Sequence, residues 1–291
     1  MPVRLRKAAL PYLLLLPGLG WLVLFFAIPL VYMGLESLKS GSPFIGGFHL
    51  TWEFSNYTDA LKDYNKQFIR SFEYAGLATG IALLIGYPLA YVIAFRGGRW
   101  KNALLLLVIV PFFVTYLIRT LSWETILSDS GIVVSTLQSI GIVSHDGRLL
   151  DTTVSVVAGI TYNFLPFMIL PLYASLERVD PRMLEAGYDL YGKRRDVFLR
   201  VTLPLSMPGV VAGVLLTFIP AAGDFINAQL LGTPRQFMIG NVIQSRYLVL
   251  NDYPTAAALS FLLMAFMLVI VIIWARIAGT EALLGTESER A

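Results

Sequence analysis

The sequence predicts an all-α, polytopic membrane protein. Of its 291 residues, 56% are hydrophobic and only 14% are charged, and the mean hydropathy is +0.69. Such a chain is too apolar for a single soluble domain. Because the apolar residues are gathered into separate long runs, we expect residues 1–291 to form a single transmembrane domain.

A helix needs about 20 mainly apolar residues to cross a hydrocarbon core about 30 Å thick. Six windows of the sequence meet this requirement, and they predict six transmembrane helices. The windows cover residues 10–35, 72–95, 103–123, 153–176, 205–223 and 254–277.

The first window follows Arg4, Arg6 and Lys7 and could be mistaken for a signal peptide. Its apolar run is longer than the roughly 7–15 residues of a signal-peptide core. No small-x-small cleavage site closes it before Glu36. We therefore expect an uncut first span.

The third and fifth windows are interrupted. Arg119 and Glu124 lie near one end of the third window, and Pro204, Pro208 and Pro220 punctuate the fifth. The distribution of basic residues orients all six helices, because cytoplasmic loops are rich in Lys and Arg. If the N-terminus is cytoplasmic, that side carries three, three, six and two of the 22 basic residues in its successive segments. Both termini are therefore predicted to be cytoplasmic, as is the loop 177–204.

The chain lacks the residues that several kinds of chemistry require. It has no cysteine, and its two histidines, His49 and His145, lie about a hundred residues apart in predicted outer loops. Gly192-Lys193 is followed by two arginines rather than by the Ser or Thr of a phosphate-binding loop. We expect no metal site and no enzyme activity, so transport energy must come from a partner or from an ion gradient.

The loop 177–204 is a polar segment between two apolar windows. Asp180-Pro181 is a good helix start, because the Asp side chain accepts from an unpaired amide and Pro suits the first helical position. Gly192 can adopt the left-handed conformation that ends a helix. The sequence therefore predicts a short helix over residues 181–191 that exposes Glu185 on one face.

This loop resembles the EAA signature of the permeases of ABC importers, which is Glu-Ala-Ala, three residues, Gly, nine residues and Ile-x-Leu-Pro. The matching positions are Glu185, Ala186, Gly187 in place of the second Ala, Tyr191 in place of the Gly with Gly192 one residue later, Val201, Leu203 and Pro204. Other stretches are similar to PotB-type permeases of spermidine/putrescine importers, namely residues 111–113, 117–120, 165–168, 171–173 and 239–243. The resemblance extends from about residue 8 to residue 274.

The resemblance implies a heteromeric importer in the bacterial inner membrane, with no cofactor bound by this chain. Its other parts are a second, PotC-type permease, an ATPase homodimer that binds ATP and Mg²⁺, and an extracytoplasmic substrate-binding protein. Glu185, Ala186 and Gly187 would dock into a groove of the ATPase. Leu203-Pro204 would act as a stiff junction at the start of the fifth span, because Pro restricts the residue before it.

Polar residues within spans usually face a cavity or a partner. The candidates for the translocation pathway are Asn163 beside Tyr162, Glu124 and Trp123 with Tyr116, and Asp224, Phe225 and Asn227. Carboxylates and aromatic faces suit a linear organic cation, although Asn163 could equally be an interhelical hydrogen-bonding residue and Asp224 a solvated loop acid. Arg119 is expected to be structural, paired with Glu124 or Asp224 or reaching toward lipid headgroups.

Two outer segments complete the chain. Residues 37–70 contain several turn glycines, and residues 131–142 could form a small surface helix. Two other functions stay open at this point. One is an ABC permease for another small organic ion or an amino-acid-like solute, and the other is a secondary transporter, which would need no docking loop.

Overall fold

The computed structural model describes residues 14–42, 46–141, 144, 147–190 and 192–278. The chain is predominantly helical, as the sequence predicts, and it divides into two compact units. The smaller unit takes its described residues from Met1–Asp63 and Ile243–Leu262, and the larger from Tyr64–Val242 and Leu263–Ala291. One boundary falls at Tyr64, whose backbone is not helical although a helix continues on both sides.

The smaller unit contains a helix, a hairpin and part of the C-terminal region. The helix runs from Leu14 to Glu36 and includes the π turn η1 (Val23–Ala27) and α2 (Ile28–Glu36). Strands β1 (Lys39–Ser42) and β2 (Gly47–Leu50) pair antiparallel, an element that the sequence analysis did not predict. Gly41 permits this pairing, since its φ is +136° and a Cβ there would lie 2.2 Å from the carbonyl oxygen of Gly47.

Most of the remaining elements belong to the larger unit. In chain order they are α3 (Ser55–Arg96), η2 (Gly98–Trp100), α4 (Lys101–Ile109), η3 (Val110–Phe113), α5 (Tyr116–Leu127), α6 (Ile132–Ser139), α7 (Thr153–Glu177), α8 (Pro181–Asp189), α9 (Arg194–Val197), η4 (Phe198–Thr202), α10 (Leu203–Ala222), α11 (Ile226–Leu231), η5 (Pro234–Gln236), α12 (Ile239–Gln244), η6 (Ser245–Val249) and α13 (Tyr253–Ala278). The α3, α12 and α13 ranges and η6 include residues of the smaller unit.

Five described helices are long and apolar enough to cross a membrane. They are Leu14–Glu36, Ser55–Arg96, Thr153–Glu177, Arg194–Ala222 and Tyr253–Trp274. The predicted third span, residues 103–123, is not one helix. It is divided between Gly98–Phe113 and Tyr116–Ser139, two segments bent by 94°. Val114 and Thr115 separate them with extended ψ angles of 136° and 147°.

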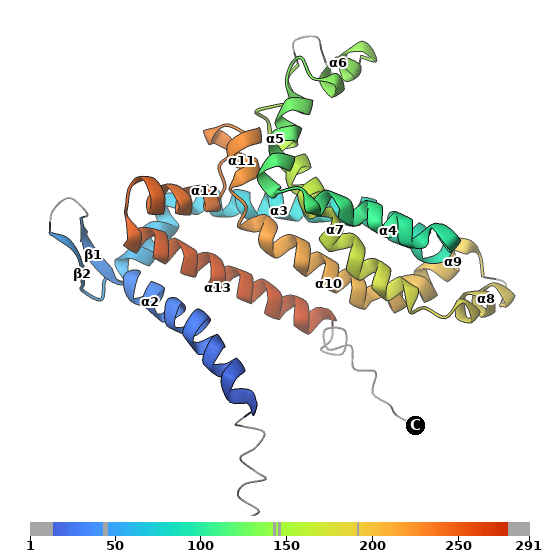
Figure 1. Cartoon of the computed structure of the whole chain (residues 1–291), viewed down its shortest axis with the longest axis horizontal. Helices are drawn as coiled ribbons and strands as arrows, with labels where there is room; N and C mark the ends of the chain where they lie inside the picture. Colours follow the sequence, from blue (N-terminus) through green and yellow to red (C-terminus); the bar gives the residue numbers. More distant parts are fainter. Residues whose placement is uncertain (1–13, 43–45, 142–143, 145–146, 191, 279–291) are drawn as a thin grey trace, which may run out of the picture. The chain divides into compact units, whose positions relative to one another are not determined.

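The hydrophobic core of the larger unit is built around α7 and α10, which lie side by side (Figure 1). Glycines of α10 line the contact surface between the two helices, which we call their seam. A Cβ on Gly209 would lie 2.6 Å from the carbonyl oxygen of Pro171, and one on Gly213 would lie 2.8 Å from the sulfur of Met168. Small residues let helix backbones approach closely, as they do in many membrane helix pairs.

Leu203-Pro204 lies at the start of α10, as predicted, but the helix is not interrupted there. Helical structure continues from Arg194 to Ala222 through the π turn η4, and Leu203 begins α10 without a break. Pro204 has no backbone N–H to donate, and η4, which directly precedes α10, is a single π turn, the form in which π-helix is found inside α-helices. The segment that follows α8 is therefore joined to α10 by continuous helix rather than by an elbow.

Candidate functional site

A cluster of polar side chains, four of them buried and one half-buried, is formed by α5, α7, α11 and the short link between α10 and α11. Its members are Tyr116, Thr120, Asn163, Asp224 and Asn227, which come from three distant parts of the sequence. Asn163 is 1% exposed and Asp224 is 7% exposed, and Thr120 and Asn227 are fully buried. Because neither protein interior nor hydrocarbon solvates such groups, they are stabilised chiefly by hydrogen bonds to one another.

Asp224 sets the direction of the hydrogen bonds in the cluster. Its Oδ1 accepts from the backbone N–H of Ile226 at 3.0 Å, and its Oδ2 accepts from Nδ2 of Asn227 at 2.6 Å. The same Nδ2 also donates to the hydroxyl of Tyr116. Since a carboxylate only accepts hydrogen bonds, the nitrogen of the Asn227 amide faces Asp224. The oxygen of that amide consequently faces α5 and α7.

The orientation of Asn227 leaves one acceptor of Asn163 without a partner. Nδ2 of Asn163 donates to Oδ1 of Asn227 at 3.2 Å and to Oγ1 of Thr120 at 3.1 Å. Oδ1 of Asn163 is buried and accepts no hydrogen bond from any described residue. A buried polar group without a partner costs about 1–3 kcal/mol. A hydrogen-bond donor such as an ammonium group would therefore be stabilised at this oxygen.

Glycines bring neighbouring backbones up to the cluster. A Cβ on Gly159 of α7 would lie 2.6 Å from Oδ1 of Asn227. A Cβ on Gly240 of α12 would lie 2.5 Å from the carbonyl oxygen of Gly223, the C-cap residue of α10. A larger residue at position 159 would push α11 away from α7, and a larger residue at position 240 would push Gly223 and Asp224 away from α12.

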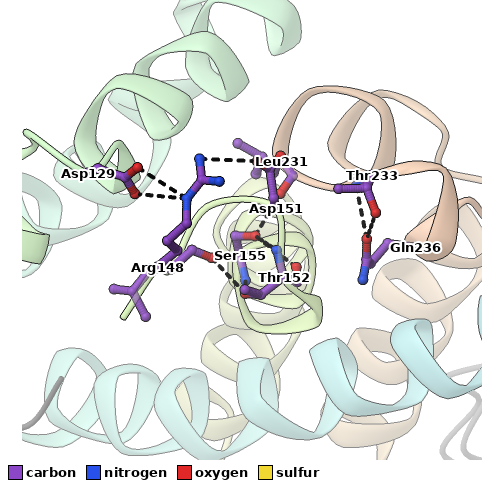
Figure 2. A network of polar contacts seen from close by, with 9 residues as sticks. Asp129, Arg148, Asp151, Thr152, Ser155, Leu231, Thr233 and Gln236 are labelled. Atoms are coloured by element: carbon purple, nitrogen blue, oxygen red, sulfur yellow. Dashed lines mark hydrogen bonds and ion pairs between the residues drawn. The ribbon is translucent and has the colours of Figure 1, made fainter. Parts of the chain in front are cut away.

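A network of polar contacts anchors α11 to the start of α7 (Figure 2). The carbonyl oxygen of Leu231, at the end of α11, accepts from Oγ of Ser155 at 2.7 Å and from the backbone N–H of Asp151 at 3.0 Å. Thr152 and Ser155 form a reciprocal capping box at the N-terminus of α7. Arg148 adds an ion pair of 3.5 Å with Asp151. This anchor holds α11 where Asn227 reaches Asn163.

Arg119 is buried beside the cluster and is held by aromatic rings. Its Cζ lies 4.8 Å from the ring centre of Phe112 and 5.6 Å from that of Tyr116. Such contacts contribute about 0.5–2 kcal/mol each. The predicted pairing with Glu124 or Asp224 is wrong, because no carboxylate of a described residue lies within ion-pair distance of this guanidinium. At 8% exposure, the side chain does not extend into solvent either.

The other predicted pathway residues lie outside this hydrogen-bonded cluster. Trp123 and Tyr162 pack with their ring centres 5.4 Å apart and line an apolar cavity of about 450 Å³ between α3, α5 and α7. Glu124 is half-buried and has no ion-pair partner among the described residues. The backbone oxygen of Phe225 accepts from Nδ2 of Asn241 at 2.8 Å. Thr120 was not predicted as a site residue, although it lies one helical turn after Tyr116 on the same face of α5.

The exposed helix α8 carries the residues of the predicted coupling loop. Its predicted start is confirmed, because Oδ1 of Asp180 accepts from the backbone N–H of Arg182 at 2.9 Å and Pro181 occupies the first turn. Glu185 and Ala186 are both exposed, and the structure shows no hydrogen bond or ion pair to the Glu185 side chain from the described residues. This face is accessible to a partner.

The end of α8 differs from the prediction. The helix ends at Asp189, and Tyr191 lies outside the described residues. Gly192 does not adopt the left-handed conformation. It is required for close approach instead, because its N–H donates to the carbonyl oxygen of Gly187 at 3.2 Å and a Cβ would lie 2.4 Å from that oxygen. Val197 packs against both glycines and connects α8 to the helix that leads into α10.

Comparison with known proteins agrees with this arrangement of spanning helices. Residues 82–279 match the family described as binding-protein-dependent transport system inner membrane component. The chain belongs to this family. It is therefore a membrane permease subunit of a transport system and not an enzyme, as the sequence indicates.

Several relatives of this permease have assigned names. It is 39% identical to the spermidine/putrescine transport system permease protein PotB of Haemophilus influenzae, over 88% of this chain and 90% of that protein. It is 36% identical to PotB of Escherichia coli, over 88% of this chain and 93% of that protein. The inner membrane ABC transporter permease protein YdcU of Escherichia coli is 33% identical, over 65% and 64% of the two chains.

Solved structures show the same fold. A chain of a bacterial ABC transporter involved in import of the acidic polysaccharide alginate aligns with a TM-score of 0.67 at 21% identity, covering 94% of this permease and 98% of that chain. A chain of the methionine transporter MetNI aligns with a TM-score of 0.56 at 14% identity, covering 73% and 93%. At these identities the likeness concerns the fold alone.

Proposed function

We propose that this permease forms half of the translocation pathway of an ATP-driven importer of the polyamines spermidine and putrescine. The observation that carries the proposal is the buried carboxylate of Asp224 in a chain that is 36–39% identical to relatives named as spermidine/putrescine permeases. A polyamine is a linear organic cation, and a carboxylate in an otherwise apolar helical domain attracts ammonium groups.

The polar cluster offers an ammonium group more than one contact. Asp224 supplies negative charge, and Oδ1 of Asn163 is a buried acceptor without a partner among the described residues. Asp224 already accepts two hydrogen bonds, which weakens its hold on a further donor. Weak binding suits a pathway, because a transported molecule must leave each site it enters. Phe225, Asn227, Glu124, Trp123 and Tyr162 complete the proposed pathway.

Coupling to ATP hydrolysis is assigned to α8 and the glycines that follow it. Glu185 and Ala186 form the exposed docking surface, and Gly187 and Gly192 pack closely at its end. Tyr191 is assigned to the same coupling site from its position in the motif alone. The continuous helix from Arg194 through Leu203 and Pro204 to Ala222 then transmits movement of the docked segment to the Asp224 link. We assign this movement to a change between inward-open and outward-open states of the pathway.

The proposal requires three kinds of partner. A PotC-type permease supplies the other half of the pathway, an ATPase homodimer binds ATP and Mg²⁺ and engages α8, and an extracytoplasmic binding protein delivers the polyamine. The support is the resemblance to PotB proteins and the shared fold with importer permeases. Both termini of this permease are placed in the cytoplasm, since most basic residues would then lie on that side.

The test is uptake of labelled spermidine by proteoliposomes that contain the complete complex and its binding protein. Asp224→Asn should reduce uptake while the complex still assembles, and Asp129→Asn is the matched control because Asp129 is exposed in a surface ion pair. Unchanged uptake by Asp224→Asn would show that this carboxylate is not part of the pathway. Accumulation of a different organic ion in place of spermidine by the unmodified complex would refute the assignment of spermidine as the substrate.

A second comparison addresses α8. Glu185→Ala should lose the stimulation of ATP hydrolysis by loaded binding protein, because the docking contact with the ATPase is weakened. Met183→Ala is the control, since Met183 is also exposed but lies on the opposite face of the helix. Full stimulation in the Glu185→Ala complex would contradict the assignment of this residue.

A further inference from the structure

Arg119 is a buried cation whose position the proposed transport pathway does not explain. It is 8% exposed, and its Nε and Nη1 atoms are buried with no hydrogen-bond partner among the described residues. A permanent structural arginine in such surroundings is normally paired with a carboxylate or with several backbone oxygens. This guanidinium has neither kind of partner in the part of the chain that the structure describes.

The rings of Phe112 and Tyr116 hold the Arg119 guanidinium, and we call this pair of rings the cation seat. The two residues lie on the two sides of the break between η3 and α5. Aromatic residues of α7 support both rings, with Phe167 5.2 Å from Phe112 and Phe164 5.9 Å from Tyr116. The seat therefore depends on the 94° bend and on α7 rather than on Arg119 itself.

The cation seat is continuous with the carboxylate cluster. The ring of Tyr116 faces the guanidinium of Arg119, and the hydroxyl of the same residue accepts from Asn227, which also donates to Asp224. An ammonium group drawn toward Asp224 would therefore meet aromatic faces that are already occupied by a cation. Two cations cannot share these faces without strong repulsion at short range.

We propose that Arg119 competes with the transported cation for the cation seat. Its guanidinium occupies the cation seat when the pathway is empty, and an entering ammonium group displaces it. The long side chain can leave through rotation of its own bonds, and no hydrogen bond from its Nε or Nη1 to a described residue has to be broken. Arg119 would thereby lower the affinity of the pathway for its substrate and favour release. This inference rests on the proposed import of polyamines.

The test is equilibrium binding of labelled spermidine to the detergent-solubilised complete complex without the binding protein. Arg119→Gln should bind spermidine about 2- to 30-fold more tightly, the range expected when one cation–π seat is freed. Arg119→Lys keeps a cation near the seat and should stay close to the unmodified complex. Phe112→Leu should bind spermidine more weakly, and combining it with Arg119→Gln should remove the gain.

Opposite effects of Arg119→Gln and Phe112→Leu distinguish competition from simple packing, which would weaken binding in both variants. Unchanged or weaker binding in Arg119→Gln overturns the inference. If this variant does not assemble, Arg119→Leu repeats the test, and failure of both to assemble also overturns it, because a competitor must be dispensable for folding. Absence of ATP-driven spermidine uptake by the unmodified complex refutes the proposed function, whereas normal uptake without tighter binding in the variant refutes only the role of Arg119.

Discussion

Replacing Gly209 with Ala tests whether α7 and α10 move as one body when α8, the proposed coupling segment, moves. The added Cβ would lie 2.5 Å from the Cβ of Ser175 and 2.6 Å from the backbone oxygen of Pro171. Unstrained carbon atoms pack about 3.5–4.0 Å apart, so the helices must separate by roughly 1 Å. Neither contacted atom is the end of a flexible side chain, so the strain cannot be relieved by a rotamer change.

Overpacking of this kind typically costs about 1–3 kcal/mol. For a chain of this size, each 1 kcal/mol lowers the unfolding temperature by about 2–4 °C. We therefore expect Gly209→Ala to unfold roughly 2–12 °C below the unmodified permease in a thermal scan of the purified protein. Gly80→Ala is the matched control, because Gly80 is also helical and a Cβ there meets no atom within 4 Å.

The second measurement on these variants is ATP hydrolysis by the complete complex, with and without loaded binding protein. Gly209→Ala should show weaker stimulation than Gly80→Ala, because a loosened seam transmits less of the movement of the coupling segment. Equal unfolding temperatures and equal stimulation in the two variants would refute the idea that this seam is tightly packed and mechanically important.

Three further substitutions have expected outcomes. Gly192→Ala places a Cβ 2.4 Å from the oxygen of Gly187, so ATP hydrolysis should become uncoupled from uptake while substrate still binds the binding protein; retained coupling contradicts the packing role. Gly159→Ala puts a Cβ 2.6 Å from Oδ1 of Asn227 and should reduce spermidine uptake, whereas normal uptake would show that the cluster tolerates displacement. Ser155→Ala loses a hydrogen bond to the end of α11 and the Ser155 half of the α7 capping box. It should lower the free energy of unfolding by about 1–3 kcal/mol in a thermal scan, and no change would show that neither contact matters for stability.

Structural features that depend only on residues adjacent in the sequence could be predicted from the sequence. Asp180-Pro181 specifies a helix start by its own chemistry, and the structure has that start. Long apolar runs likewise indicate where spanning helices form. The break at Val114 and Thr115 was not predicted, because residues 103–118 carry no charge and Pro111 is the only strong local signal near the break.

The composition of the site could be predicted better than its contacts. Asp224, Asn227 and Asn163 were identified as polar residues in apolar surroundings, and the structure brings these three together. Their mutual orientation depends on hydrogen bonds between residues that are far apart in the sequence, so it could not be derived from spacing. The seat of Arg119 was missed for the same reason, since it exists only because the chain bends.

The most direct test of the central claim is to compare spermidine accumulation in proteoliposomes that contain the complete complex with accumulation in proteoliposomes that contain the two permeases without the ATPase. The account predicts ATP-dependent accumulation by the complete complex and none by the permeases alone. Accumulation driven by an ion gradient in the absence of the ATPase would contradict it.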